Sequence, residues 1–208
     1  MAFTSPAYWP QAQRELSARD AVLRELISRF GGFCLNRRSS AFVTLSRAII
    51  GQQISVKAAH SVWLKLATTV ETVRPEHLCA LSDEALRGCG LSRQKMLYLR
   101  DLAQRFMDGS LNVRRWQRRG DEEIIAELTT VKGIGRWTAE MFLIFYLLRP
   151  NVLPLTDIGL QRAVSKYYNN DAPASADEIR AVAENWSPWR SVATWYLWRS
   201  FDPVPVEY

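Results

Sequence analysis

Two glycines and two basic residues are grouped in the segment VKGIGR, residues 131–136. Gly133 and Gly135 permit backbone conformations that other residues resist, and they leave the amides at the start of the next helical segment accessible. A helix N-terminus with accessible amides binds anions, and Lys132 and Arg136 add positive charge beside it. This chemistry suits a nucleic-acid phosphate. The spacing equally allows an ordinary αα-hairpin whose glycines only close the turn.

A single aspartate, Asp157, follows the proline-containing loop of residues 150–156 and precedes a helical pattern. In that place an aspartate is first of all an N-cap, a role worth about 1 kcal/mol. A carboxylate in a low-dielectric site also stabilises positive charge on a sugar whose glycosidic bond is breaking, and it can orient or deprotonate an attacking water. Position alone favours the capping role.

Cysteine and histidine counts exclude several kinds of site. Three cysteines are too few for a four-cysteine iron–sulfur cluster, and their odd number argues against a disulfide framework. The two histidines stand in no metal-ligand spacing, so we expect no zinc.

Composition bounds the class of protein. Of 208 residues 48% are apolar, enough to bury one core or two small lobes. The net charge of +6 is more often found in an ordinary globular protein than in a nucleic-acid-binding one. The run RRWQRR, residues 114–119, reads as a solvated face. No stretch of the sequence is long and apolar enough to suggest a membrane span, and the N-terminus has no secretion signal. We therefore expect a cytoplasmic protein, or a nuclear one in a eukaryote.

Helix signals recur along the chain and strand signals do not, so we expect an all-α fold of about ten helices. Residues 1–18 and 202–208 read as peripheral segments. Caps, glycines and prolines bound the expected helices at residues 20–30, 40–70 with a break at Gly51, 82–88, 92–108, from Asp121, 136–148, 158–168, from Ser175, and from Ser187–Pro188 to about 201.

Five segments resemble the helix-hairpin-helix DNA glycosylase superfamily, and most closely its bacterial 3-methyladenine DNA glycosylase II, or AlkA-like, branch. The resemblance covers about residues 20–201. The segments are LTTVKGIGRWTAEMF (128–142), LPLTDIGLQRAV (153–164), AIIGQQIS (48–55), CGLSRQK (89–95) and WSPWRSVATWYLW (186–198).

This resemblance implies one glycosylase domain over residues 1–208, with two helical lobes flanking a cleft for DNA and the target base. The helix-hairpin-helix motif would cover about residues 121–148. The central lobe would take in about residues 40–150, and the second lobe residues 19–39 plus 151–208. Larger bacterial relatives carry an N-terminal α/β domain, which we expect to be missing here together with any pocket residue that it supplies.

The resemblance further implies a monofunctional glycosylase that removes alkylated purines, of the 3-methyladenine and 7-methylguanine type, from double-stranded DNA in base excision repair. The base is flipped out of the duplex, and Asp157 is catalytic. Relatives that also cut the backbone carry a nucleophilic lysine where this sequence has Trp137. We therefore expect water as the nucleophile, no lyase activity, no required cofactor and a monomer.

The base pocket implied by the resemblance contains Trp137 and Trp198. A cationic alkylated base over an indole face gains about 0.5 to 2 kcal/mol. Met141 and Ile158 occupy further pocket positions where the branch often has aromatic residues, which leaves the lesion range open. Five further tryptophans are expected to pack or cap: Trp63, Trp116, Trp186, Trp189 and Trp195.

Contacts with DNA are also implied. When the target base leaves the duplex, a wedge residue fills the space that it vacates, and the register of the resemblance places this wedge at Arg93. Leu91 lies two residues before it. The alternative is that Arg93 lies on an exposed helical turn and contacts a phosphate. Gln53 matches a position near the orphaned base, and its neighbour Gln52 is the weaker candidate. The alternative is that Gln53 is an ordinary core or helix-surface residue. Lys132, Gly133, Gly135 and Arg136 would hold a phosphate.

The superfamily's hairpin commonly binds a monovalent cation, Na⁺ or K⁺, on backbone carbonyls. By register these carbonyls belong to Thr129, Val131 and Ile134. The ion would bridge them to a DNA phosphate.

Three other interpretations remain open. A non-catalytic helix-hairpin-helix DNA-binding module would not need Asp157. A bifunctional glycosylase for oxidised bases is disfavoured by Trp137 and by the few cysteines. An unrelated α-helical interaction protein would have no affinity for DNA at about 0.1 M salt.

Overall fold

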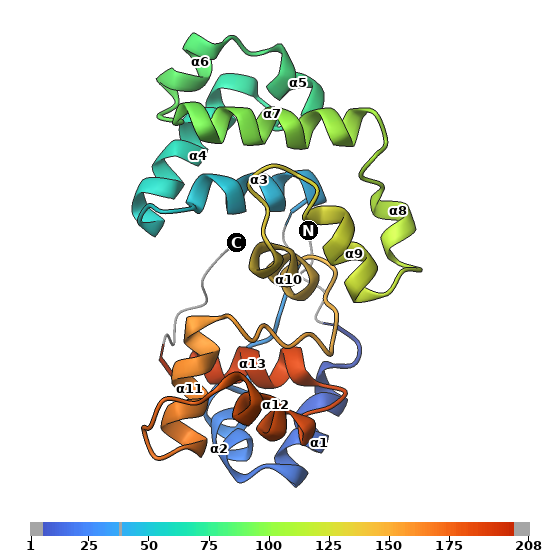
Figure 1. Cartoon of the computed structure of the whole chain (residues 1–208), viewed down its shortest axis with the longest axis vertical. Coiled ribbons are helices and arrows are strands. Elements are labelled where there is room, and N and C mark those ends of the chain that lie inside the picture. Colours follow the sequence, from blue (N-terminus) through green and yellow to red (C-terminus); the bar gives the residue numbers. More distant parts are fainter. Residues whose placement is uncertain (1–5, 38, 202–208) are drawn as a thin grey trace. The chain divides into compact units, whose positions relative to one another are not determined.

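The computed structural model describes residues 6–37 and 39–201, and within these ranges it contains thirteen α-helices and no strand (Figure 1). This confirms the all-α fold class predicted from the sequence. In the same ranges no helix is long and apolar enough to cross a membrane.

The chain divides into two compact units. One is Ser39–Phe142, and the other combines the described parts of Met1–Arg38 and Leu143–Glu207. The boundary falls within α10 (Arg136–Phe145).

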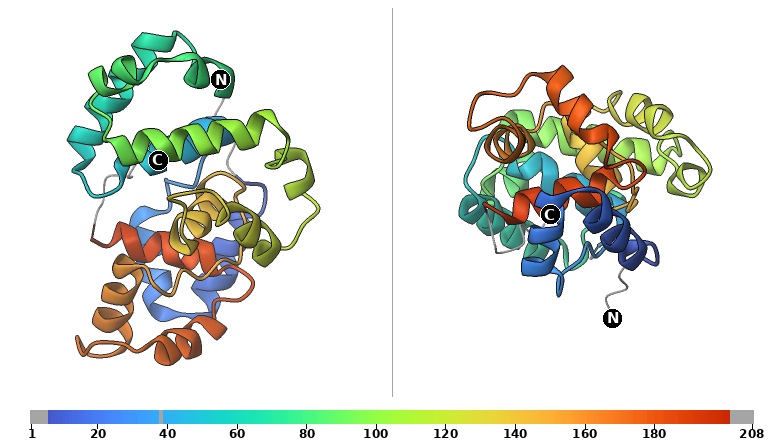
Figure 2. Two further views of the ribbon diagram at one scale, coloured as in Figure 1. Left: turned by 45° about the horizontal axis from the view of Figure 1, so that its top comes forward. Right: turned by 90° about the horizontal axis from the view of Figure 1, so that it is seen from below.

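The unit Ser39–Phe142 is built around α7. It contains α3 (Ala41–Gly51), α4 (Val56–Val70), α5 (Pro75–Ala80), α6 (Asp83–Gly88), α7 (Arg93–Met107), α8 (Val113–Trp116), α9 (Asp121–Leu128) and the first part of α10. The apolar stripe predicted for α7 is buried at Met96, Leu99, Leu102 and Ala103. α5 and α6 lie on one side of α7 (Figure 1; Figure 2, left).

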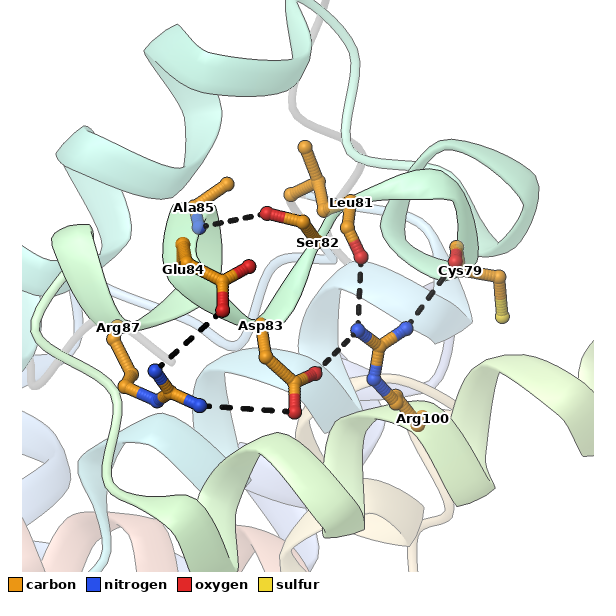
Figure 3. Close-up of polar contacts among 8 residues, drawn as sticks. All are labelled: Cys79, Leu81, Ser82, Asp83, Glu84, Ala85, Arg87 and Arg100. Atoms are coloured by element: carbon orange, nitrogen blue, oxygen red, sulfur yellow. Dashed lines mark hydrogen bonds and ion pairs between the residues drawn. The ribbon is translucent and has the colours of Figure 1, made fainter.

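Arg100 of α7 ties α5 and α6 to this core (Figure 3). Its guanidinium donates to the carbonyls of Cys79 (3.2 Å) and Leu81 (2.8 Å) and to the carboxylate of Asp83 (2.8 Å). One side chain therefore satisfies two carbonyls at the end of α5, which a short helix leaves without intrahelical donors. Arg87 adds longer contacts to Asp83 and Glu84.

The second unit contains α1 (Trp9–Arg19), α2 (Ala21–Phe30), α11 (Ile158–Tyr168), α12 (Ala176–Glu184) and α13 (Arg190–Arg199). α13 packs against α1, α2 and α11, and eight of its ten residues are buried. Asp20 joins α2, α11 and the segment between α12 and α13. It caps α2 by accepting the Leu23 N–H (3.0 Å), and it accepts hydrogen bonds from the Tyr168 hydroxyl (2.9 Å) and the Trp186 indole (3.0 Å).

Two expectations, about α1 and α9, are corrected. The segment expected to be peripheral contains α1, because Trp9, Ala12 and Leu16 recur at three- and four-residue steps and are buried against the second unit's core. The cap of α9 is Gly120 rather than Asp121, since the Glu123 carboxylate accepts the Gly120 N–H (2.9 Å). The C-terminal segment 202–208 lies outside the described residues.

Two helix ends in the C-terminal half also differ from expectation. α10 ends at Phe145 rather than residue 148, because Leu148 adopts a left-handed conformation (φ 54°) that turns the chain before Pro150. α13 begins at Arg190, so Ser187 and Pro188 do not cap it. The carbonyl of Trp189 accepts the first N–H groups of the helix, from Val192 and Ala193.

Two short helices, α5 and α8, were not expected at all. At six and four residues, both are too short for an apolar period to be visible in the sequence.

Candidate active site

Asp157 stands at the N-terminus of α11 and is 8% exposed. Its Oδ1 accepts two hydrogen bonds of 2.7 Å, one from the backbone N–H of Leu160 and one from the indole Nε1–H of Trp198. The loop before it is held in place, since Gln161 donates to the carbonyl of Leu155 (2.8 Å). The carboxylate is therefore an N-cap and, at the same time, a buried acceptor that α13 orients.

Trp198 reaches Asp157 only because residue 159 is a glycine. A Cβ at Gly159 would lie 2.9 Å from Cδ1 of Trp198 and 3.1 Å from Oδ1 of Asp157. The Trp198 ring also stacks on Phe145, with centroids 5.7 Å apart and planes at 13°. Sequence reasoning missed Gly159 and Phe145, although a glycine two residues after the aspartate was a visible signal for close approach.

The hairpin turn of residues 129–135 joins α9 to α10 and contains one conformationally essential glycine. Gly133 has φ +82°, and a Cβ there would lie 2.1 Å from the Tyr98 ring of α7. Gly135 was expected to need glycine's freedom too, but it has no positive φ and a Cβ there would meet nothing within 4 Å. Its carbonyl begins α10 by accepting the Ala139 N–H (3.1 Å), and its surface is exposed.

Two residues from other elements of the same unit support this turn. Gln52 donates from Nε2 to the carbonyl of Gly133 (2.7 Å). Lys95 in turn donates from Nζ to the carbonyls of Ile50 and Gln52, both at 2.7 Å, and burial lowers the pKa of its amine. Gln53, the neighbour preferred from the sequence, is exposed and has φ 58°.

The two basic residues of the turn differ in their surroundings. Lys132 is exposed, and its backbone N–H donates to Asp101 (2.9 Å). Arg136 forms two hydrogen bonds to Glu122 and one from Nε to the buried Glu140 (3.0 Å). The hydrogen bonds to Glu122 raise the pKa of Arg136 and lower that of Glu122. Carboxylates therefore balance the charge of Arg136, whereas Lys132 presents its charge to solvent.

The carbonyls expected to hold a cation are those of Thr129, Val131 and Ile134. The Val131 carbonyl accepts the Ile134 N–H (3.1 Å) within the turn. A carbonyl oxygen has two lone pairs, so this bond is compatible with an ion ligand. Across the residues that the structure describes, no three His, Cys, Asp or Glu side chains are grouped as a metal site.

The other predicted site residues occupy both units. In Ser39–Phe142, Trp137 is 39% exposed in the first turn of α10 and Met141, one turn later, is buried. Arg93 is exposed as the first residue of α7, and Leu91 is buried. In the other unit, Ile158 follows Asp157 and is 70% exposed. The five tryptophans expected to pack are all buried: Trp63, Trp116, Trp186, Trp189 and Trp195.

Comparison with known proteins places this geometry in a family. Residues 46–188 match the model of the HhH-GPD superfamily base excision DNA repair protein. DNA-3-methyladenine glycosylase 1 of Schizosaccharomyces pombe is 29% identical over 197 residues, which are 91% of this chain and 86% of the relative.

Two solved structures are similar over nearly the whole chain. A DNA-3-methyladenine glycosidase from Bacillus halodurans superposes with a TM-score of 0.85 at 32% identity, covering 97% of this chain and 93% of its own. The S. pombe 3-methyladenine DNA glycosylase Mag1, in complex with abasic DNA, has a TM-score of 0.80 at 29% identity, covering 91% and 96%. The match over most of the sequence and over the fold shows that this chain belongs to the HhH-GPD superfamily of base excision DNA repair proteins.

Proposed function

We propose that this chain is a monofunctional DNA glycosylase that hydrolyses the N-glycosidic bond of alkylated purines in double-stranded DNA. The observation that carries the proposal is the buried carboxylate of Asp157, which follows the helix-hairpin-helix motif and is oriented by Trp198. The relatives named 3-methyladenine glycosylases support the substrate class, and the abasic DNA in one of them is what base removal leaves.

The proposed reaction uses one carboxylate. The bond between the sugar C1′ and the base nitrogen breaks, and its electron pair leaves with the base, which departs neutral because alkylation had made it cationic. Positive charge remains on the deoxyribose, and a buried carboxylate stabilises it. Water then bonds to C1′ and loses a proton, so that an abasic sugar remains. Asp157 stabilises the charge and orients or deprotonates the water.

The absence of a lyase step rests on Trp137. A backbone-cutting glycosylase needs an amine that forms a Schiff base with the sugar, and this sequence has an indole at the position given by the resemblance. Borohydride reduction in the presence of methylated DNA is expected to trap no protein–DNA adduct. A covalent adduct that persists after denaturation would contradict the monofunctional assignment.

The remaining site residues have proposed roles of two kinds. Trp137, exposed in the first turn of α10, stacks on the flipped cationic base. Met141, Ile158 and Trp198 have the base-contacting roles that the family resemblance implies. Arg93 enters the duplex as the wedge.

DNA is held mainly at the hairpin turn. Lys132 and the backbone of Gly133 and Gly135 contact a phosphate, with Na⁺ or K⁺ on the carbonyls of the turn. Arg136, paired with two carboxylates, contributes less than its charge suggests, and Gln53 lies near the orphaned base. No cofactor takes part in the chemistry, and the protein acts as a monomer.

The deciding experiment compares wild type with Asp157→Asn on methylated duplex DNA, with released bases separated by chromatography. Asparagine caps a helix as well as aspartate, so the substitution removes the charge and spares the fold. We expect wild type to release methylated purines and the variant to be slower by about 100-fold or more, with DNA binding retained.

Asp20→Asn is the matched control. Asp20 is also a buried N-cap that accepts a tryptophan indole hydrogen bond, but it lies outside the motif. Both of its oxygens accept hydrogen bonds, so Asp20→Asn turns an amide N–H toward a buried donor and should lower stability. The folded variant is nevertheless expected to release bases at the wild-type rate. Turnover by Asp157→Asn at the wild-type rate would overturn the assignment, and DNA binding by wild type without base release would favour a non-catalytic DNA-binding module.

A further inference from the structure

A basic hollow of about 510 Å³ lies on the unit Ser39–Phe142. None of the residues that line it was predicted as a site residue. It is lined by side chains of α8 and the segment that follows it: Asn112, Arg114, Arg115, Gln117, Arg118 and Arg119. Its lining contains four cations, two amides and no carboxylate. Such a lining fits a ligand with several negative charges.

The hollow stands on a fixed base. Trp116, at the centre of α8, is fully buried and packs edge-on against Phe142, with centroids 5.3 Å apart. Its indole donates to Glu127 of α9 (2.9 Å). Asn112 caps α8 by accepting the Arg114 N–H (3.1 Å). A buried tryptophan inside an arginine run thus anchors the segment and turns the arginines outward.

Three of the four arginines keep their charge exposed. Arg119 pairs with Glu127. Arg114, Arg115 and Arg118 are exposed, and none of them forms an ion pair with a carboxylate of the described residues. Holding three like charges together without counterions is unfavourable in the free protein, so an anion that binds there relieves the repulsion.

The segment that lines the hollow comes directly before α9 in the chain, and the hairpin turn comes directly after it. Trp116 and Arg119 of that segment both contact Glu127, in the last turn of α9. The hollow and the hairpin turn are therefore held by the same helix of one unit. The acidic side chains between the two places are engaged, since Glu122 pairs with Arg136 and Glu123 accepts the Gly120 N–H.

We propose that Arg114, Arg115 and Arg118 form a second phosphate-binding site, which holds the DNA backbone flanking the lesion while the hairpin turn holds it at the lesion. The inference rests on the proposed function for its choice of ligand. Guanidinium groups suit phosphate oxygens because they donate two hydrogen bonds in one plane. The site supplies affinity and register, and it takes no part in base release.

The test replaces all three arginines by glutamine and measures binding to duplex DNA carrying one abasic-site analogue as salt is varied. Each phosphate contact contributes about 0.9 to the slope of log K against log salt. We therefore expect the slope to become shallower by about 2 to 3, with affinity at about 0.1 M salt at least tenfold weaker. The single-turnover rate of base release at saturating DNA should stay within about twofold.

A matched variant distinguishes the loss of this binding site from a simple reduction of the protein's net charge. It neutralises three exposed arginines elsewhere and lowers the charge by the same amount, and it should change the slope much less. Its substitutions are Arg14→Gln, Arg29→Gln and Arg74→Gln, three exposed arginines that form no ion pair among the described residues.

Duplex length gives an independent measurement. Wild type should bind a duplex of about 30 bp more tightly than one of about 10 bp, a single helical turn, and the hollow variant should lose most of that difference. Equal slopes and equal length dependence in wild type and hollow variant would overturn the second site. Failure of wild type to release methylated bases would overturn the proposed function instead, and a reduced slope in the hollow variant would still support the site.

Discussion

Trp198 and Asp157 are 41 residues apart in the chain, and an indole hydrogen bond of 2.7 Å joins them. The bond connects the most buried helix of its unit, α13, to the first turn of α11. A carboxylate that must face developing charge gains from being held in one direction, because no reorganisation is then needed during the reaction. Trp198 is thus a positioning residue for Asp157, in addition to its proposed place in the base pocket.

Trp198→Phe is expected to keep the stacking on Phe145 and to lose the hydrogen bond to Asp157. A hydrogen bond to a charged group contributes about 1.5–3 kcal/mol, so base release should slow by about tenfold to 100-fold. Single-turnover kinetics on methylated duplex DNA measure the effect. Trp189→Phe, which removes an indole bond to Glu15 on the same unit, is the control. A Trp198→Phe rate equal to wild type would show that the indole does not position the carboxylate.

The two glycines of the hairpin turn should respond differently to alanine. Gly133→Ala places a Cβ at a positive φ and against the Tyr98 ring, and backbone strain of this kind alone costs about 1–3 kcal/mol. Gly135→Ala meets open space and should change stability by no more than about 0.5 kcal/mol. Urea unfolding of both variants tests the difference. Equal stabilities would mean that the turn relaxes without cost.

The Glu122–Arg136 pair predicts a pH dependence. The pKa of Glu122 lies below its ordinary value of 4.5 in the folded protein, chiefly because Arg136 donates hydrogen bonds to it. The stability that the ionised Glu122 contributes to the folded protein is therefore complete above pH 4.5, and it is lost as the pH falls through the lowered pKa. Because the pair is exposed, that contribution is no more than about 1 kcal/mol.

The measurement is the difference in unfolding free energy between wild type and Glu122→Gln, which should be present at neutral pH and shrink in acid. Glu25→Gln, an exposed glutamate of α2 without an ion pair among the described residues, gives the baseline. A difference that is constant from neutral to acid pH would contradict the lowered pKa.

Much of the helical framework was readable from local sequence. Asp20, Ser40, Ser82, Ser92 and Ser175 stand where the structure begins helices, and each side chain accepts the N–H three residues later. A cap is a contact between residues three apart in the chain, so the sequence carries it whole. The same holds for the family motif, whose glycines, lysine and aspartate lie within 26 residues.

Local sequence was insufficient where a distant residue completes the contact. Gly133 and Gly135 look alike in VKGIG, yet only Gly133 faces a tyrosine from α7. Arg136 reads as a free cation until Glu122 pairs with it across the hairpin. α1 reads as a peripheral segment because its three buried residues have no visible partner in the sequence.

Composition, the helix starts that carry a side-chain cap and the glycosylase motif were thus determined by the sequence itself, through interactions that span a few residues. Tertiary structure alone decided the partners of Asp157, Gly133 and Arg136 and the outward arginines around Trp116. These depend on which helix faces which, and that is settled by burial of apolar surface summed over whole helices rather than by any short run of residues.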